Sequence, residues 1–241
     1  MFRIRLAGIT VEIDNRHNYV YEQCADYLCF DSAPAFRVAV STADTLAYQA
    51  TCGRPVTLPE AESYLLYRRI CERMPKYGVF LLHAAVVELD GRGYAFSARR
   101  GTGKSTHTEL WQTRFGGHAG DRYKATVING DKPLIRRAPD GRFWAYGTPW
   151  CGKEGKGVNR RCPLNAICFL EQGSENRVTV TSTADAAARI MEATVLPPDT
   201  EGQDRMAALV GATVRDIPAL TLACRPDMEA VEVAYEFLSQ I

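Results

Sequence analysis

The stretch Ser97-Ala-Arg-Arg-Gly-Thr-Gly-Lys-Ser-Thr106 (SARRGTGKST) carries the pattern of a phosphate-binding loop in its second half. The apolar run GYAFSA precedes it and a helical pattern from Lys104 to Phe115 follows, which is the strand–loop–helix context that the motif requires. Glycines let successive backbone N–H groups turn toward phosphate oxygens, and the N-terminus of the helix adds partial positive charge. The stretch therefore predicts a nucleotide-binding loop in an α/β fold.

Each part of the loop has an expected role. Lys104 is expected to neutralise the β- and γ-phosphates, and the Ser105 hydroxyl to bind Mg²⁺, so that ATP and Mg²⁺ are the predicted ligands. Ala98 stands where the full pattern has glycine, which matters little if the later glycines make the close approaches. Arg99 and Arg100 are either extra contacts for an anion or a solvated basic turn. The residues expected to bind the nucleotide are Gly101, Thr102, Gly103, Lys104, Ser105 and Thr106.

Two further side chains are candidates for chemistry at this loop. Transfer of a phosphoryl group needs a carboxylate that holds metal and a group that takes the acceptor's proton. Asp131 follows the apolar run ATVIN, and His83 lies in the apolar run that precedes the hairpin turn DGRG. On their own, Asp131 in NGDKP is more typical of a turn, and His83 of a structural residue in an apolar strand.

Three runs of sequence carry a family resemblance: LHAAVVELDGRGYAFSARRGTGKST, VINGDKPLI and YGTPWCGKEGKGVNRRCPLNAICFLEQ. Together they resemble the HPr kinase/phosphorylase family, and more closely the small HPr-kinase-like proteins of the phosphoenolpyruvate-carboxykinase superfamily. In that family an active-site histidine, a loop lysine and a loop Ser/Thr match His83, Lys104 and Ser105. The family usually has two adjacent aspartates after the next strand, one for metal and one as general base. Here only Asp131 fits, since its neighbours are Gly130 and Lys132.

The resemblance implies an ATP- and Mg²⁺-dependent kinase that transfers the γ-phosphoryl group to a hydroxyl of a peptide, protein or small molecule. Asp131 is then either the base, with Ser105, phosphates and water holding Mg²⁺, or the metal ligand, with His83 assisting as base. The missing second aspartate leaves a second hypothesis open: a nucleotide-binding sensor or interaction module without transfer. Hexameric relatives make a homo-oligomer a further expectation. A true carboxykinase is disfavoured, because the chain is short and shows no motif for oxaloacetate.

The basic, glycine-rich segment TPWCGKEGKGVNRRCPL follows the predicted strand FWAYG. It predicts a loop that closes over ATP and acceptor, with Arg160 as a catalytic residue and Lys153 and Arg161 binding the acceptor; the alternative is a solvated loop. Cys151 is disfavoured as a nucleophile because no histidine partner is identifiable. Trp111 is expected in packing, and His107 and His118 at the surface.

Composition excludes several classes of partner. The chain has 241 residues, 46% hydrophobic and 24% charged, as expected of a soluble globular protein. Its 29 basic and 28 acidic residues leave a net charge of +1, so no nucleic-acid-binding surface is predicted. No segment approaches the roughly 20 apolar residues that span a bilayer, so we expect a cytoplasmic protein without membrane contact. The eight cysteines form no C-x-x-C pair and predict no zinc site.

The order of the elements predicts an α/β fold with mixed sheets flanked by helices, because hairpins join many of the strands. We expect a single kinase-like domain: a β-rich N-terminal extension over 1–56, made of short strands and turns, and the P-loop core over 57–241. The capping box Thr57-Leu-Pro-Glu60 begins a helix. Further helices are expected at 185–195, 203–214 and from Asp227, and PPDTEGQDR is expected to be an exposed loop.

Overall fold

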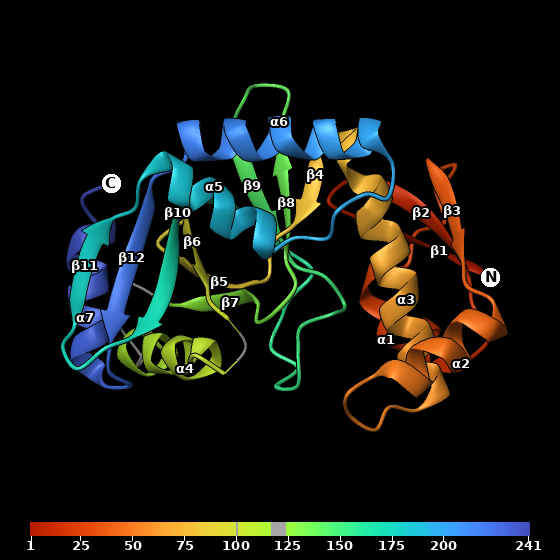
Figure 1. Cartoon of the computed structure of the whole chain (residues 1–241), viewed down its shortest axis with the longest axis horizontal. Helices are drawn as coiled ribbons and strands as arrows, with labels where there is room; N and C mark the ends of the chain where they lie inside the picture. Colours follow the sequence, from red (N-terminus) through yellow and green to blue (C-terminus); the bar gives the residue numbers. More distant parts are fainter. Residues whose placement is uncertain (100, 117–123) are drawn as a thin grey trace.

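The computed structural model describes residues 1–99, 101–116 and 124–241. Its N-terminal part is a three-stranded sheet in the order β1–β2–β3, which lies at the right of Figure 1. β1 and β2 form a hairpin, and β3 joins β2 in parallel. The strands are β1 (Phe2–Leu6), β2 (Ile9–Asp14) and β3 (Phe36–Ala39).

The N-terminal part also contains two helices, α1 (Asn18–Gln23) and α2 (Thr42–Thr51). α1 lies in a stretch that the sequence left unassigned, whereas α2 corrects the prediction of strands and turns. The physical reason for α2 is a capping box: Ser41 Oγ accepts from the backbone N–H of Asp44, and the Asp44 carboxylate accepts from the N–H of Ser41. This box uses Asp in place of the commoner Glu or Gln.

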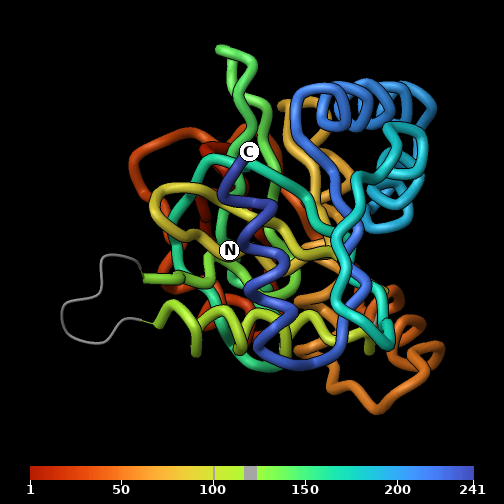
Figure 2. Tube along the Cα trace, turned by 90° about the vertical axis from the view of Figure 1, so that its left-hand side faces the viewer, coloured from red at the N-terminus to blue at the C-terminus, as the bar shows by residue number. Residues whose placement is uncertain are grey.

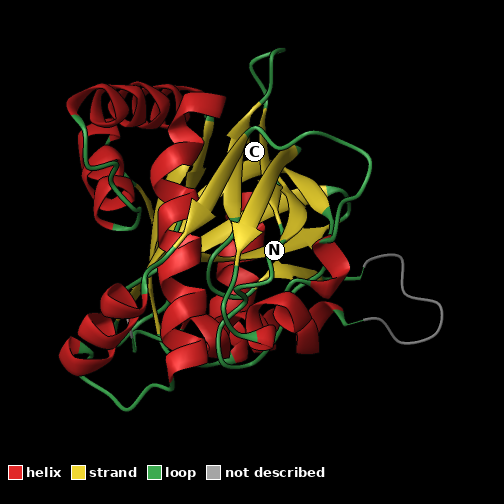
Figure 3. Cartoon of the chain, turned by 90° about the vertical axis from the view of Figure 1, so that its right-hand side faces the viewer, coloured by secondary structure: helices red, strands yellow, loops and turns green. Residues whose placement is uncertain are grey.

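Helix α3 (Leu58–Arg73) begins at the predicted capping box, with Thr57 as its N-cap. Its apolar face joins the N-terminal strands in one hydrophobic cluster, in which Ile4 and Val11 pack with Leu66 and Ile70. Figure 3 looks from the side of the N-terminal sheet and shows its strands beside this helix. The boundary at residue 57 stays a prediction, and the cluster joins the chain on both sides of it.

The larger sheet confirms the predicted mixed α/β class. Among the described residues it has nine strands, in the order β4-β8-β9-β10-β6-β5-β7, with β12 also on β10 and β11 on β12. β6, β10 and β12 run parallel, whereas the other pairings are antiparallel. The strands are β4 (Val79–Leu81), β5 (Ala84–Leu89), β6 (Arg92–Ser97), β7 (Thr126–Asn129), β8 (Leu134–Arg137), β9 (Phe143–Tyr146), β10 (Arg161–Gln172), β11 (Arg177–Val180) and β12 (Ala219–Cys224).

Helices cover both faces of this sheet (Figures 1 and 2). The alternation of side chains in β10 separates the two layers: Cys168 and Leu170 pack toward α4 (Lys104–Phe115) and α7 (Met228–Leu238). Ile167 and Phe169 pack toward α5 (Thr183–Glu192) and α6 (Thr200–Asp216) on the other face. These layers bury the sheet and leave its edge for the connecting loops.

Two boundaries differ from the sequence predictions. α6 begins at Thr200 because the Asp199 side chain accepts from the N–H of Gly202, so PPDTEGQDR is only partly a loop. α5 ends at Glu192, short of the predicted residue 195. None of the helices among the described residues is long and apolar enough to cross a membrane.

His107 is buried in α4, which corrects the expected surface position, while His118 lies outside the described residues. The Nε2 atom of His107 accepts from Trp111 Nε1 at 3.0 Å, and the His107 ring contacts the Phe96 ring edge-on. Trp111 is fully buried, as expected of a packing residue. Burial lowers the pKa of His107 from 6.5 to about 4.

This buried histidine predicts a loss of stability in mild acid. The unfolded chain takes up a proton as the pH falls below about 6.5, whereas folded His107 stays neutral down to about pH 4, so acid favours unfolding. Between pH 7 and pH 5 the free energy of unfolding should fall by about 2 kcal/mol from this group. In His107→Gln, whose amide oxygen can still accept from Trp111, this part of the fall should disappear in urea titrations. Equal falls in both proteins would show that His107 is not the source.

Candidate active site

The sheet brings the predicted site residues to one edge. β6 and β7 run in the same direction with antiparallel β5 between them, so β6 and β7 end where β5 begins. Ala84 pairs with Ser97, and Val86 with Asn129. The chain just before β5, just after β6 and just after β7 therefore meets at this edge. These three segments carry His83, the phosphate loop and Asp131.

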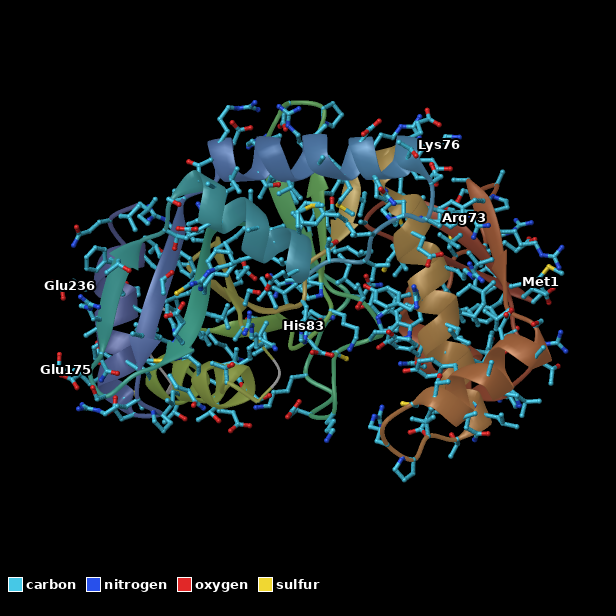
Figure 4. The ribbon with its side chains drawn as sticks, viewed as in Figure 1. Met1, Arg73, Lys76, His83, Glu175 and Glu236 are labelled. Carbon is cyan, nitrogen blue, oxygen red and sulfur yellow. The ribbon has the colours of Figure 1, made fainter. Side chains whose placement is uncertain are left out.

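His83 is not inside a strand, as the sequence suggested, but in the two-residue break between β4 and β5. The strands on its two sides pair with different neighbours: β4 with β8, and β5 with β6 and β7. Its N–H donates to Ala193 O at 2.7 Å, and its carbonyl accepts from Ser97 Oγ at 3.0 Å. The backbone of His83 is thus held on both sides, and Figure 4 shows the side chain in the middle of the molecule.

The loop has the geometry that a phosphate cradle needs. Gly101 and Gly103 have positive φ angles of 84° and 119°, which side chains disfavour. α4 begins at Lys104, so the first N–H groups of the helix, at Lys104, Ser105 and Thr106, have no partner within it. Ala98 is not among the described residues with positive φ, so its conformation does not require glycine. Thr102 closes the turn by donating its N–H to Arg99 O, and Arg100 lies outside the described residues.

Lys104, His83 and Asp131 form a connected cluster. Lys104 Nζ donates to Ala98 O at 3.1 Å and lies 3.2 Å from His83 Nε2. The same Nε2 lies 3.0 Å from Asp131 Oδ1. A carboxylate, an imidazole and an ammonium thus face one another beside the open N-terminus of a helix.

The cluster changes the ionisation of its members. Burial lowers the pKa of Lys104, Lys132 lowers it further, and Asp131 acts in the opposite direction. Burial alone would raise the pKa of Asp131, but the hydrogen bond with His83 and the charge of Lys132 outweigh it, so this pKa lies below its usual range. Asp131 is consequently ionised at neutral pH.

Asn129, which sequence reasoning missed, fixes the turn that carries Asp131. It is fully buried, and its Oδ1 accepts from the N–H groups of Asp131 at 2.9 Å and Lys132 at 2.7 Å. Its Nδ2 donates to Thr148, to the carbonyl at 3.1 Å and to Oγ1 at 3.0 Å. An Asn at the start of N-G-D-K is itself the signal for such a turn, in which the side chain bonds the backbone two residues on.

A helix of the N-terminal half supports the same turn. Tyr67 of α3 donates its hydroxyl to Lys132 O at 2.9 Å, and Thr148 Oγ1 donates to the same carbonyl at 2.9 Å. The Tyr67 ring stacks on Trp150, with centroids 4.0 Å apart. Trp150 in turn donates to Ser63 Oγ of α3 at 2.9 Å. Helix α3 is therefore part of the support of the candidate site.

The loop after Trp150 is docked at the site. Lys156 Nζ contacts Glu109 Oε1 at 3.2 Å and Gln112 Oε1 at 3.1 Å, both on α4, and Lys156 O accepts from Gly130 N at 2.9 Å. A Cβ atom at Gly152 would lie 2.9 Å from Asp131 Cβ. The loop therefore packs directly on the candidate acid.

The basic residues predicted in this segment do not gather at the cluster. Arg160 Nη2 pairs with Glu88 Oε2 at 3.2 Å, and Glu88 lies five positions along β5 from His83, about 16 Å for an extended strand. The Arg161 guanidinium lies 4.4 Å from the centre of the Trp144 ring. Lys153 is exposed. These interactions place Arg160 and Arg161 beside partners other than His83 and Asp131. The roles predicted for Arg160, Arg161 and Lys153 stay predictions.

A cleft of about 710 Å³ opens beside the loop. His83 and the loop form one wall, and the end of β10 and the end of α5 form the other. Charged side chains in it are paired: Arg189 with Glu171, and Arg99 with Glu192 at 3.7 Å. The residues that line it are His83, Ser97, Ala98, Arg99, Gly101, Thr102, Phe169, Leu170, Glu171, Gln172, Arg189, Glu192 and Ala193. Its volume falls within the range of small-molecule sites.

The two residues predicted to bind Mg²⁺ lie in different surroundings. Ser105, in the first turn of α4, stands where a phosphate loop places its metal-binding hydroxyl. Asp131 Oδ1 contacts His83 and Oδ2 forms a direct ion pair with Lys132, and its role as a metal ligand stays a prediction. Within the described ranges, no three His, Cys, Asp or Glu side chains are grouped to hold a metal.

Comparison with known proteins yields one family. A family model described as "SynChlorMet cassette protein ScmC" matches residues 63–197, which is more than half of the chain. A search of curated proteins finds no match. Among solved structures, an HPr(Ser) kinase/phosphatase from Coxiella burnetii aligns with a TM-score of 0.38 and 9% sequence identity, over 66% of this chain and 97% of that one.

Proposed function

This chain belongs to the family described as SynChlorMet cassette protein ScmC, and we propose that it is an ATP- and Mg²⁺-dependent kinase with a hydroxyl group as acceptor. One observation carries the proposal: the phosphate loop with its lysine lies in contact with a histidine–carboxylate pair at the same sheet edge. A loop alone binds a nucleotide, whereas transfer also needs groups that handle the acceptor. The resemblance to HPr-kinase-like proteins, drawn from the sequence motifs, supports the same reaction.

In the proposed complex the β- and γ-phosphates lie against the N–H groups of the loop and α4, and Lys104 moves from His83 to the phosphates. Mg²⁺, held by Ser105 and the phosphates, supplies charge neutralisation on the nucleotide. The acceptor oxygen bonds to the γ-phosphorus, the bond from that phosphorus to the β–γ bridging oxygen breaks, and ADP leaves. The acceptor's proton passes to the His83–Asp131 pair.

The cleft beside the loop is the proposed position of the acceptor. It includes His83 and the outer face of the loop but not Ser105 or Thr106 at the start of α4. A hydroxyl that enters along β10 and α5 would reach the γ-phosphate next to His83. The acceptor is a peptide, protein or small molecule, and the need for ATP keeps the cytoplasm as the proposed compartment.

A second function, nucleotide binding without transfer, is favoured by one observation. Both oxygens of Asp131 are engaged by neighbouring side chains, His83 at Oδ1 and Lys132 at Oδ2, so this carboxylate is already partnered where an acceptor's proton would have to be taken up. Under this alternative ATP binds but its γ-phosphoryl group stays on the nucleotide.

Transfer assays separate the two functions. Purified protein should bind ATP with Mg²⁺ by calorimetry. It should also label at least one member of a panel of free hydroxy amino acids and serine- or threonine-containing peptides from radiolabelled ATP, with phosphoserine or phosphothreonine identified by mass spectrometry. Binding with no labelling across the panel and no release of ADP supports the second function. Absence of nucleotide binding contradicts both.

A further inference from the structure

Lys132 directly follows Asp131 and is, with Gly130, one of the two neighbours where the resemblance leads one to expect a second acid. Its ammonium forms a direct ion pair with Asp131 Oδ2, while His83 Nε2 lies 3.0 Å from Oδ1. The Lys132 side chain is 30% exposed and that of Asp131 is 21% exposed. The carboxylate is thus shared between an imidazole on one side and an ammonium on the other.

The backbone of Lys132 is fixed, whereas its ammonium is at the end of a flexible stem. The N–H donates to Asn129 Oδ1 at 2.7 Å, and the carbonyl accepts from Tyr67 and Thr148. These contacts set where the side chain starts. Four rotatable methylenes then let the ammonium leave Asp131 for a nearby anion without moving the turn.

Two ammonium groups contact the His83–Asp131 pair, Lys132 at Asp131 and Lys104 at His83. The positive charge of Lys132 acts to lower the pKa of Lys104. Asp131 lies between them, in contact with Lys132 directly and with Lys104 through His83. The Asp131 carboxylate thus balances two cations. The charge of exposed Glu154 also acts to raise the pKa of Lys104, as that of Asp131 does. The cluster is suited to an incoming polyanion.

We propose that Lys132 binds the terminal phosphoryl group of a nucleotide held by the phosphate loop, from the side opposite Lys104. The inference rests on the proposed nucleotide site. In this arrangement Lys132 takes the place of a metal ion at Asp131, because its ammonium supplies the positive charge that the metal would bring there. Asp131 then holds Lys132 and His83 in position, and Mg²⁺ is confined to the Ser105 side of the phosphates.

The test is a comparison of two nucleotides on four proteins. ADP reports on the loop alone, whereas AMP-PNP, a non-hydrolysable ATP analogue, also presents a terminal phosphate. Their dissociation constants are measured by calorimetry with Mg²⁺ for wild type, Lys132→Met, Lys132→Arg and Lys76→Met. Lys76 is exposed and lies at the rim of the molecule in Figure 4, so it is the matched control.

We expect wild type, Lys132→Arg and Lys76→Met to bind AMP-PNP more tightly than ADP. Lys132→Met should lose this preference by about tenfold or more, the usual worth of a charge-assisted contact, while its ADP affinity stays within about threefold of wild type. Thermal unfolding of each variant shows that it is folded.

Three results would overturn the proposal. An unchanged preference in Lys132→Met, with ADP still bound, shows that Lys132 does not touch the terminal phosphate and leaves the proposed function intact. A rise in Mg²⁺ affinity without a change in preference shows that Lys132 only blocks a metal site at Asp131. Absence of ADP binding by the wild type overturns the nucleotide site and this inference together.

Discussion

Lys104→Ala should abolish phosphoryl transfer and weaken ATP binding by about 100-fold or more. The Lys104 ammonium brings a full positive charge to the loop at the start of α4, and charge-assisted hydrogen bonds contribute about 1.5–3 kcal/mol. About 2.7 kcal/mol corresponds to 100-fold in the dissociation constant. Calorimetry with ATP and the radiolabel assay measure the two effects separately.

Lys104 is almost fully buried, so a substitution could reduce ATP binding by unfolding the protein as well as by removing the charge. Lys104→Met keeps the apolar stem and removes only the charge, so it should show the same loss of binding with a thermal unfolding temperature near that of wild type. Lys76→Ala, an exposed lysine in the 3-10 turn before β4, is the matched control and should bind ATP as wild type does. Transfer that survives Lys104→Ala would mean that the loop is not where the γ-phosphate sits.

The loop was predictable because its signals are local. The glycines at 101 and 103, the lysine and the following helical pattern lie within one short stretch, and the structure shows the expected positive φ angles and the helix start at Lys104. The capping box at Thr57 was local in the same way. Asp44 did not match the expected Glu or Gln, so α2 was missed although its capping contacts are the same in kind.

The contacts around Asp131 were not predictable, because they depend on strand register and on side-chain direction. His83 and Asp131 are 48 residues apart, and they meet because β5 pairs with β7 in one particular register. Lys132 reads in sequence as an ordinary turn lysine, and its direction depends on Asn129 and on Tyr67 from another part of the chain. The partner of Arg160 was equally unpredictable, because Glu88 lies 72 residues away in the chain, and the catalytic role of Arg160 stays a prediction.

Asp131→Asn should lower kcat by about 10³, while ATP affinity should fall by no more than about tenfold, the share proposed for Lys132. A positioned group that handles the acceptor's proton contributes about 10²–10⁴-fold, and the substitution removes the negative charge while keeping the shape. The neutral amide can no longer hold the His83 proton or balance Lys132, whereas the loop that binds the phosphates is untouched. Steady-state kinetics with the acceptor identified in the transfer assay, together with ATP titrations, measure the two quantities.

The pH dependence gives the same prediction a second readout. Because the pKa of Asp131 lies below its usual range, the carboxylate is ionised at all pH values above that range, and its protonation contributes no acid limb to kcat between pH 5 and 9. Protonation of Asp131 itself should therefore add no pH dependence to the loss of kcat in Asp131→Asn across this interval. Asp204→Asn, exposed on α6, is the control for removing one surface carboxylate. If Asp131→Asn instead reduces ATP affinity and leaves kcat unchanged, Asp131 acts on the bound nucleotide and not on the acceptor, and the assignment of the His83–Asp131 pair as the proton acceptor fails.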